Sequence, residues 1–256
     1  EDARERAIAI GIWAAIASGG AAFGPVIGGV LLEYFWWGSV FLINVPVVIV
    51  ALLLAVPFVP SDEGHASRPW DFIGSVQVMV GLVALAFFIE QLGARERELG
   101  LMIGAAVVGV LAMVLFVRRQ RNSAAPLIDF KLFRDNRFTA GVIAALVAST
   151  VLVGVELVMS QRLQLVLDHS PLQAAFAILP IPLAAFVSGP LAGMLVPRLG
   201  AGRVLWGSLA LAGIGLAGYL VVHNGPLALV VLTLVAFGFG LGATMTAAST
   251  AIMDNA

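Results

Sequence analysis

The chain has 256 residues, of which 61% are hydrophobic and 11% are charged, and its formal net charge is −1. Because soluble domains carry roughly 25% charged residues, this composition excludes an ordinary soluble protein and indicates a polytopic helical membrane protein. The chain contains no cysteine, which excludes a disulfide framework and a thiolate metal site within it. It lacks an initiating Met and both ends read as loops, so we expect a segment of a longer protein.

Eight stretches of the chain are apolar over about 20 residues, the length that crosses a bilayer as a helix. We therefore expect an all-α fold, a transmembrane bundle with eight spans. The sixth span carries three prolines that should bend it. The approximate limits of the spans are 8–32, 39–59, 72–92, 99–117, 139–163, 172–196, 204–222 and 226–252.

The distribution of Lys and Arg predicts how the spans are oriented. When the loops are assigned to alternate sides, 11 of the 14 basic residues fall on one side, and only Arg95, Arg97 and Arg162 fall on the other. Because Lys and Arg are enriched in cytoplasmic loops, we expect both ends of this segment to face the cytoplasm.

The longest polar stretch, residues 118–138, follows the fourth span and contains six of the basic residues. In it, apolar side chains alternate with charged ones. This pattern is typical of a short helix or turn that lies on the membrane surface, with its apolar face in lipid. The stretch is also the best candidate for a linker between two helical bundles.

A stripe of glycines marks the first span. Gly20, Gly24 and Gly28 are spaced four residues apart, so on a helix they form one face without side chains, against which another helix can pack closely. Pro25 cannot donate a backbone hydrogen bond and should bend the helix there. The pattern fits a hinge surface along which a neighbouring helix slides, and it fits a static helix contact equally well.

Glu156 is the acidic residue that lies well inside a predicted span. An ionisable group at the bilayer centre costs at least about 2.5 kcal/mol, so such groups are usually functional. Ser149, Ser160 and Gln164 share its helix face. Glu156 is therefore a candidate for binding a proton or a cationic ligand, with Ser149 and Ser160 as polar neighbours. The alternative is a structural carboxylate held by hydrogen bonds or by an arginine outside this segment.

Four other charged residues receive more local interpretations. Asp71 precedes the third span, where a carboxylate caps free N–H groups and meets the positive end of the helix dipole. Glu90 lies near the outer end of the third span and can extend to water. Arg162 and Asp168 fall at the outer boundary of the fifth span, where gate or loop roles are expected.

No pattern in the sequence indicates an enzyme. The three histidines lie in predicted loops far apart and have no metal-ligand spacing, so we expect neither a metal site nor a catalytic triad. The segment GFGLG at 238–242 superficially resembles a phosphate loop, but it lies in an apolar span. The basic residues form a belt along the membrane rather than a nucleic-acid-binding face.

Several segments together resemble a known family. G-A-A-F-G-P-V-I-G-G at 20–29 resembles the antiporter signature in helix five of the major facilitator superfamily. Other segments resemble landmarks of its fourteen-helix drug/proton antiporter branch. These are W-W-G-S-V-F-L-I-N-V-P (36–46), A-P-L-I-D-F-K-L-F-R-D-N-R-F (125–138), S-P-L-Q-A-A-F-A-I-L-P (170–180) and V-P-R-L-G-A-G-R (196–203). The resemblance covers essentially the whole chain and is nearest to bacterial efflux pumps for quaternary ammonium compounds and dyes.

The resemblance implies a domain organisation. The eight spans would be helices five to twelve of fourteen. Residues 1–60 would then be the last two helices of an N-terminal six-helix bundle, and residues 61–117 an extra helix pair inserted between the halves. Residues 118–138 would be the cytoplasmic linker, and residues 139–256 the first four helices of the C-terminal bundle.

The resemblance also implies a function, the proton-coupled export of lipophilic cations by alternating access in a bacterial cytoplasmic (inner) membrane. The proton gradient would supply the energy, no cofactor would be needed, and the partners would be cationic drugs or dyes and membrane lipids, with the protein a monomer. Glu156, with Ser149 and Ser160, would bind the cation or a proton in competition, and Glu90, Arg162 and Asp168 are secondary candidates. The hinge between the halves would comprise Gly20, Gly24, Pro25, Gly28 and Gly29.

Two alternatives remain open at this point. The same fold could carry a neutral or anionic metabolite or a lipid. A protein of another class, a membrane scaffold or sensor that does not transport, would dock a partner through residues 118–138 and would move no protons when a substrate is added.

Overall fold

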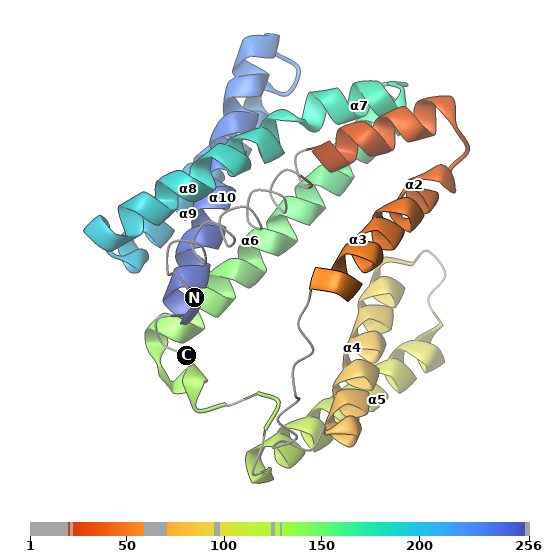
Figure 1. Cartoon of the computed structure of the whole chain (residues 1–256), viewed down its shortest axis with the longest axis vertical. Coiled ribbons are helices and arrows are strands. Elements are labelled where there is room, and N and C mark those ends of the chain that lie inside the picture. Colours follow the sequence, from red (N-terminus) through yellow and green to blue (C-terminus); the bar gives the residue numbers. More distant parts are fainter. Residues whose placement is uncertain are drawn as a thin grey trace. The chain divides into compact units, whose positions relative to one another are not determined.

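The computed structural model describes residues 20, 23–58, 71–94, 98–123, 126–128 and 130–253. These residues are helical or lie in turns and loops, and none of them forms a strand (Figure 1). The chain divides into two compact units, one of Glu1–Val59 with Asp135–Ala256 and the other of Pro60–Arg134.

The first unit contains most of the helices. Its described part comprises a helix over Phe23–Tyr34, α2 (Ser39–Leu42), α3 (Asn44–Phe58), α6 (Asn136–Gln161), the π-helical turn η2 (Arg162–Val166), α7 (Pro171–Ile178), α8 (Pro180–Leu199), α9 (Ala201–Val222) and α10 (Leu227–Met253). The second unit contains α4 (Phe72–Gly93), α5 (Leu99–Asn122) and the short 3-10 turn η1 (Leu132–Arg134).

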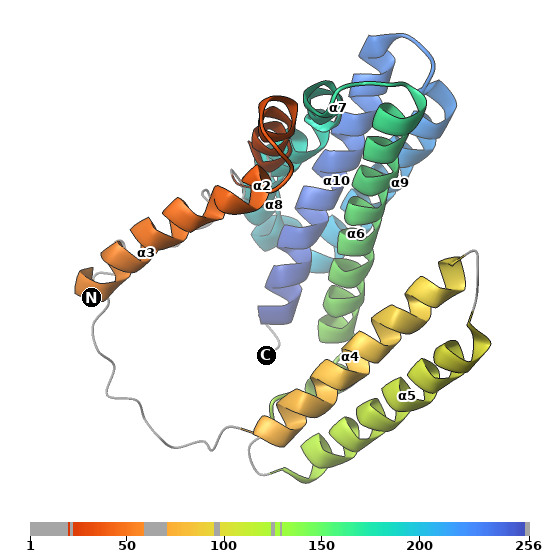
Figure 2. The ribbon, with the colours of Figure 1, turned by 90° about the vertical axis from the view of Figure 1, so that its right-hand side faces the viewer.

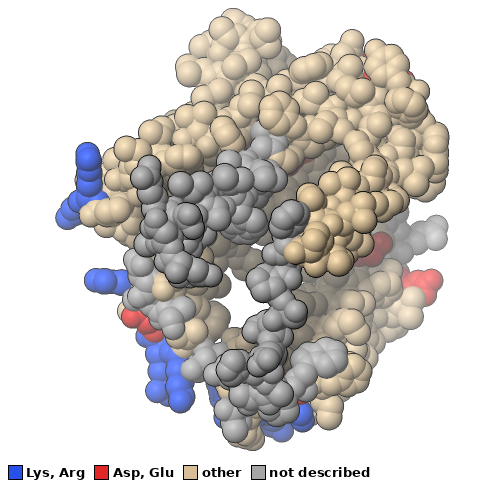
Figure 3. Space-filling model, in the orientation of Figure 1, with Lys and Arg blue, Asp and Glu red and all other residues tan. Residues whose placement is uncertain are grey.

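The predicted spans agree well with these helices. Seven segments among the described residues are long and apolar enough to cross a membrane. They correspond to the second to eighth predicted spans. Most of the first predicted span, 8–32, lies outside the described residues, and its described part belongs to the helix Phe23–Tyr34. On the face drawn in Figure 3, most of the described residues are uncharged.

The sixth predicted span is divided into two helices at its first proline, Pro180. Helices α7 and α8 meet at Leu179, directly before Pro180. The hydrogen bonds from Leu179 N to Ala175 O (3.0 Å) and from Leu183 N to Leu179 O (3.2 Å) continue the helical pattern across the junction. The interruption follows from the missing N–H of proline, as the sequence predicts.

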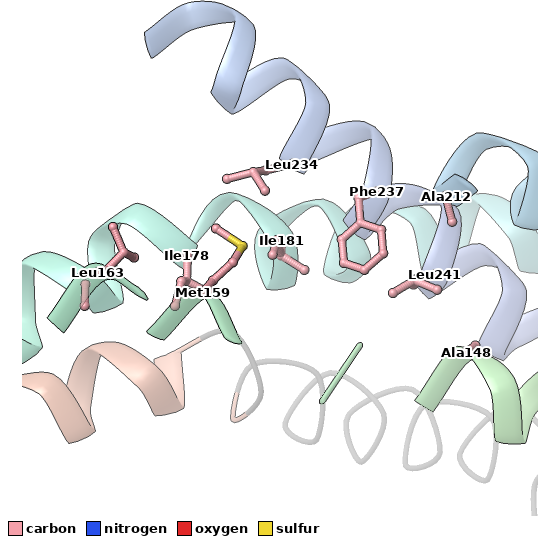
Figure 4. Close-up of a cluster of buried hydrophobic side chains, with 10 residues drawn as sticks. Ala148, Met159, Leu163, Ile178, Ile181, Ala212, Leu234, Phe237 and Leu241 are labelled. Carbon is pink, nitrogen blue, oxygen red and sulfur yellow. The ribbon is translucent and has the colours of Figure 1, made fainter. Parts of the chain in front are cut away.

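Helix α10 is the centre of the first unit. It packs against α8, α9 and α6, and its course beside α6 is visible in both ribbon views (Figures 1 and 2). One buried cluster includes Ile181 of α8 together with Leu234, Phe237 and Leu241 of α10 (Figure 4). Ala148, Met159 and Leu163 extend the same cluster onto α6 and η2.

Three glycines let α10 approach two neighbours at once. A methyl group placed on Gly240 would lie 2.5 Å from the backbone nitrogen of Ala212 and 2.6 Å from the carbonyl oxygen of Ser208, both in α9. On the other side, a methyl group on Gly238 would overlap the carbonyl of Ile181, and one on Gly242 would lie 2.5 Å from the carbonyl oxygen of Ala185. The GFGLG segment is therefore a packing motif that fits α10 between the backbones of α8 and α9.

A buried pair of hydroxyl groups accompanies the contact between α9 and α10. Ser208 Oγ and Thr244 Oγ1 lie 2.8 Å apart, and Thr244 is fully buried. Each hydroxyl also donates to or approaches a carbonyl of its own helix, at Leu205 and Gly240. Interhelical hydrogen bonds of this kind contribute about 0.6 kcal/mol each in membrane proteins, so the pair adds specificity to a contact formed mainly by close packing.

The second unit is an antiparallel hairpin of α4 and α5, which lie side by side in both ribbon views (Figures 1 and 2). At one end Asp71 caps α4, as predicted, by accepting a hydrogen bond from Gly74 N (2.9 Å). The same carboxylate binds Arg119 Nε (2.8 Å) and Gln120 Nε2 (2.9 Å) of α5. The Gly74 N–H, the Arg119 guanidinium and the Gln120 amide hold the pKa of Asp71 below its ordinary value.

The buried amide of Gln120 joins the hairpin to the segment that follows it. Gln120 is only 2% exposed, and while its nitrogen donates to Asp71, its oxygen accepts a hydrogen bond from the backbone N–H of Leu127. Helix α5 runs to Asn122, beyond the apolar stretch that ends at residue 117. Arginine is a good helix former, and its charge is favourable at a helix C-terminus, so the first arginines of the predicted linker belong to the helix.

The close packing of α10 can be tested with one methyl group. We expect Gly240→Ala to lower the free energy of unfolding by about 1–3 kcal/mol, because the neighbouring atoms are backbone and cannot turn away. The measurement is thermal unfolding of the full-length protein in detergent.

The matched control is Gly213→Ala in α9, where an added methyl group meets no described atom within 4 Å. This variant should be neutral or more stable, because Ala favours a helix over Gly by about 1 kcal/mol. A Gly240→Ala protein that unfolds at the wild-type temperature would contradict the packing described here.

Candidate functional site

Glu156 lies in the longest of the described spans. Helix α6 and the turn η2 form one apolar segment of 31 residues, Asn136–Val166. Glu156 stands ten residues before its end, about 15 Å along the helix axis, and its side chain is half-buried. It is the only acidic residue in the membrane spans that the structure describes in the first unit.

The face of α6 that carries Glu156 borders the buried cluster. Leu152 and Val155 pack against that cluster, and Met159 belongs to it (Figure 4). At 3.6 residues per turn, Glu156 is adjacent to this apolar stripe. The carboxylate is therefore at the edge of the packed interior, between the core and the exposed side of the helix.

The two serines of the predicted polar stripe share this face but have other partners. Ser160 Oγ accepts a hydrogen bond from Gln164 Nε2 (2.8 Å), and Ser149 Oγ lies 3.9 Å from Met245 Sδ of α10. Glu156 itself makes no hydrogen bond or ion pair with any residue that the structure describes. Ser149 and Ser160 are therefore engaged with other partners, and neither is hydrogen-bonded to Glu156.

The glycine motif makes its close contact through one residue. A methyl group on Gly29 would lie 3.0 Å from Leu172 Cα and 3.1 Å from both Ala175 Cβ and the carbonyl oxygen of Pro171. By contrast, a methyl group on Gly20, Gly24 or Gly28 would meet no described atom within 4 Å. Pro25 is half-buried, and the predicted bend there involves residues 21–22, which lie outside the described residues.

The contact at Gly29 joins two of the segments on which the family resemblance rests, 20–29 and 170–180. Its partner surface is the first turn of α7. That turn is fixed by a capping box, in which Ser170 Oγ accepts from Gln173 N (3.3 Å) and Gln173 Oε1 accepts from Ser170 N (3.1 Å). A rigid helix start therefore faces a helix position that has no side chain.

The secondary candidates, Glu90, Arg162 and Asp168, have no hydrogen bond or ion pair with Glu156. Glu90 is exposed near the end of α4, in the second unit. Arg162 begins the π-helical turn and its Nη2 donates to Asn224 Oδ1 (2.8 Å). Asp168 is an exposed loop residue with a φ of 51°. Arg162 thus lies in the helical turn that ends the span, and Asp168 lies in the loop after it.

Sequence reasoning missed two polar clusters. It assigned Asp71 to helix capping but did not pair it with Arg119 and Gln120, and it did not pair Ser208 with Thr244. The first pair could have been found, because an acid that begins one span and an arginine that ends the next lie on the same side of a hairpin. Within the described residues, no group of His, Asp and Glu could hold a metal ion.

Comparison with known proteins decides the family. The sequence pattern of the Major Facilitator Superfamily matches residues 2–256. The chain belongs to the Major Facilitator Superfamily. The resemblance seen in the sequence is thereby confirmed, and the chain is a multi-pass helical segment of a superfamily transporter.

Several superfamily members with curated names are similar to this chain. It is 40% identical over 215 residues to the methyl viologen resistance protein SmvA of Salmonella typhimurium, covering 84% of this chain and 43% of SmvA. It is 31% identical over 253 residues to the multidrug efflux pump LfrA of Mycolicibacterium smegmatis, covering 98% and 50%. It is also 31% identical over 245 residues to the riboflavin transporter RibZ of Clostridioides difficile, covering 94% and 52%. The chain spans about half the length of these relatives.

The contact at Gly29 can be tested by cross-linking. Because residues 1–256 contain no cysteine, the double variant Gly29→Cys with Ala175→Cys introduces a single pair. The pair can be studied in full-length protein whose other cysteines have been replaced. The Cβ separation of 3.1 Å is close to the roughly 3.5–4.5 Å of a disulfide, so oxidation should link the two residues.

A protease site inserted at 61–70 separates the two cysteines in sequence, so linked fragments stay together on a gel until they are reduced. The matched control, Gly24→Cys with Ala175→Cys, should give little cross-linked product. Equal cross-linking of both pairs would contradict the placement of Gly29 against α7.

Proposed function

We propose that the chain is part of a transporter that exports lipophilic cations in exchange for protons, by alternating access of a central site to the two sides of the membrane. Support comes from the functions for which its relatives are named, which include methyl viologen resistance and multidrug efflux. Methyl viologen carries two permanent positive charges, so a carboxylate in an apolar site is a suitable partner for it.

The observation that carries the proposal is the unpaired carboxylate of Glu156 in an apolar span. Such a group costs at least about 2.5 kcal/mol in a membrane, and no described residue compensates it. A bound cation or a bound proton would each remove this penalty. Glu156 is therefore proposed as the residue for which the two compete.

Competition at one carboxylate is sufficient to couple the two fluxes. When Glu156 is ionised, its charge holds the cation among apolar side chains. When it takes up a proton, the charge is lost and the cation is released. Because the site can hold only one of the two at a time, it returns across the membrane with a proton bound. Each exported cation is thereby exchanged for a proton.

The contact at Gly29 is proposed as part of the moving surface. Small residues allow two helix backbones to approach closely, and a surface without side chains presents little obstruction to sliding. Transporters built from repeated bundles rock one bundle against the other. The helix Phe23–Tyr34 and α7 would slide against each other during this motion.

Neutralising Glu156 tests the proposal. In the full-length protein, Glu156→Gln should lower the rate of ethidium efflux from cells by about tenfold or more, because interactions with a charged group contribute about 1.5–3 kcal/mol. The control is Glu98→Gln, an exposed residue before α5 whose side chain makes no capping hydrogen bond. It should transport at close to the wild-type rate at equal expression.

Binding measured across pH separates a proton-competing site from a merely structural one. Ethidium binding to the purified wild-type protein should weaken as the pH falls, because protonation removes the negative charge at Glu156. In Glu156→Gln the binding of ethidium should be weaker, and its affinity should not fall as the pH is lowered. Unchanged efflux in Glu156→Gln would remove Glu156 from the mechanism.

A different cargo is a second candidate, and the similarity to the riboflavin transporter RibZ favours considering it. A panel of ethidium, methyl viologen and riboflavin in proteoliposomes with a fixed pH gradient distinguishes the two. We expect both cations, and not riboflavin, to drive proton movement. Proton movement with riboflavin alone would establish the second candidate.

A further inference from the structure

The end of the α4–α5 hairpin at which Asp71 lies is the most basic part of the second unit. Between residues 118 and 134 the sequence contains five basic residues and one acidic residue. Helix α5 has 24 residues, about 36 Å of helix, whereas the hydrocarbon core of a bilayer is about 30 Å thick. A helix of this length extends beyond the hydrocarbon core, and its basic last turn suits the headgroup layer, where the lipid phosphates lie.

A cavity of about 430 Å³ opens at this end of α5. It is lined by Arg118, Arg119, Asn122 and Ser123, which are residues that can donate hydrogen bonds. Its volume falls within the range of about 300–1,000 Å³ that is typical of small-molecule sites. Two guanidinium groups and two smaller polar side chains suit an anion with several oxygen atoms, because guanidinium groups can bind phosphate through paired hydrogen bonds.

One of the two arginines is held in place by the fold. Arg119 Nε binds Asp71 Oδ1 at 2.8 Å, and Asp71 is fixed in turn by Gly74 N and Gln120 Nε2. The terminal nitrogens of Arg119 make no hydrogen bond to a residue that the structure describes, and its side chain is 42% exposed. The guanidinium is therefore oriented before a ligand arrives, which reduces the entropy lost on binding.

Stabilisation of the helix end or of Asp71 does not account for both arginines. Basic residues in the last turn of a helix interact favourably with its C-terminal dipole, but that dipole amounts to only about half a negative charge. Asp71 is already satisfied by Arg119 and the two amide donors. Arg118 has no partner among the described residues, so the cavity keeps an excess of positive charge.

The segment after α5 is tied to the same end of the helix and carries exposed apolar side chains. The backbone of Leu127 is bound to Gln120, and the side chains of Leu127 and Ile128 are 48% and 40% exposed. Exposed apolar side chains on a segment bound to Gln120, the residue after Arg119, suit the glycerol and acyl part of a lipid. This combination favours a lipid over free phosphate.

We propose that the end of α5 is a binding site for an anionic membrane lipid, whose phosphate is held by Arg118 and Arg119 while its apolar part lies against Leu127 and Ile128. Basic pockets at the ends of membrane helices are suited to such headgroups. Occupancy would fix the hairpin and the start of the linker to the membrane surface. The proposal does not depend on the identity of the cargo.

The test compares two arginines of the same helical turn. The full-length protein is purified in detergent, and the binding of phosphatidylglycerol is measured by native mass spectrometry, with phosphatidylcholine as the neutral lipid. We expect tighter binding of phosphatidylglycerol. Arg118→Gln should weaken it by about fivefold, the effect of about 1 kcal/mol per basic residue near the surface.

The matched control is Arg121→Gln, which removes the same charge from an exposed residue that does not line the cavity. It should change the affinity by less than about twofold, because its contribution is long-range and screened. Both variants should unfold at the wild-type temperature, since neither side chain takes part in the Asp71 contacts. Equal losses in both variants would show general charge attraction only and would overturn the site.

A competition arm distinguishes the source of the phosphate. Excess inorganic phosphate should displace little phosphatidylglycerol if the apolar contacts contribute to binding. Complete displacement would instead assign the cavity to a free anion, and equal binding of phosphatidylcholine would exclude recognition of the anionic headgroup. Either result would overturn the proposal.

Discussion

The first unit depends on the close approach of three helix backbones. In lipid, apolar side chains gain little by leaving their surroundings, so helices associate mainly through packing and interhelical hydrogen bonds. Gly238, Gly240 and Gly242 give α10 two faces without side chains, one toward α8 and one toward α9. The buried Ser208–Thr244 pair then fixes the register of α9 and α10.

This packing also determines where α6 presents its carboxylate. Helix α10 contacts α6 through the cluster that contains Ala148 and Met159. The orientation of α6 about its axis is thereby set, and Glu156 falls at the edge of the buried stripe. A half-buried carboxylate at such an edge fits the exchange of a cation for a proton that is proposed above.

Much of this arrangement could be predicted from the sequence, because length and hydrophobicity decide which segments span a membrane. The spans, the capping role of Asp71 and the interruption at Pro180 follow from local rules. The contacts do not, since spacing shows which residues share a helix face but not which helix they meet. Four-residue spacing singled out Gly20, Gly24 and Gly28, yet Gly29 makes the close contact. The 238–242 glycines show their role only once α8 and α9 are in place.

The charges of the described spans differ in how the fold compensates them. Asp71 and Arg119 neutralise each other where the hairpin meets the headgroups, and Arg162 donates to Asn224 at the end of α6. Both interactions lie near the ends of helices, close to water, where an unpaired charge would cost little free energy. Glu156 lies deeper, where compensation matters more, and no described residue provides it. Glu90 and Arg118 also have no partner among the described residues, but both are exposed, whereas Glu156 is half-buried in an apolar span. The proposed binding of a cation or a proton would remove the free-energy penalty of that carboxylate.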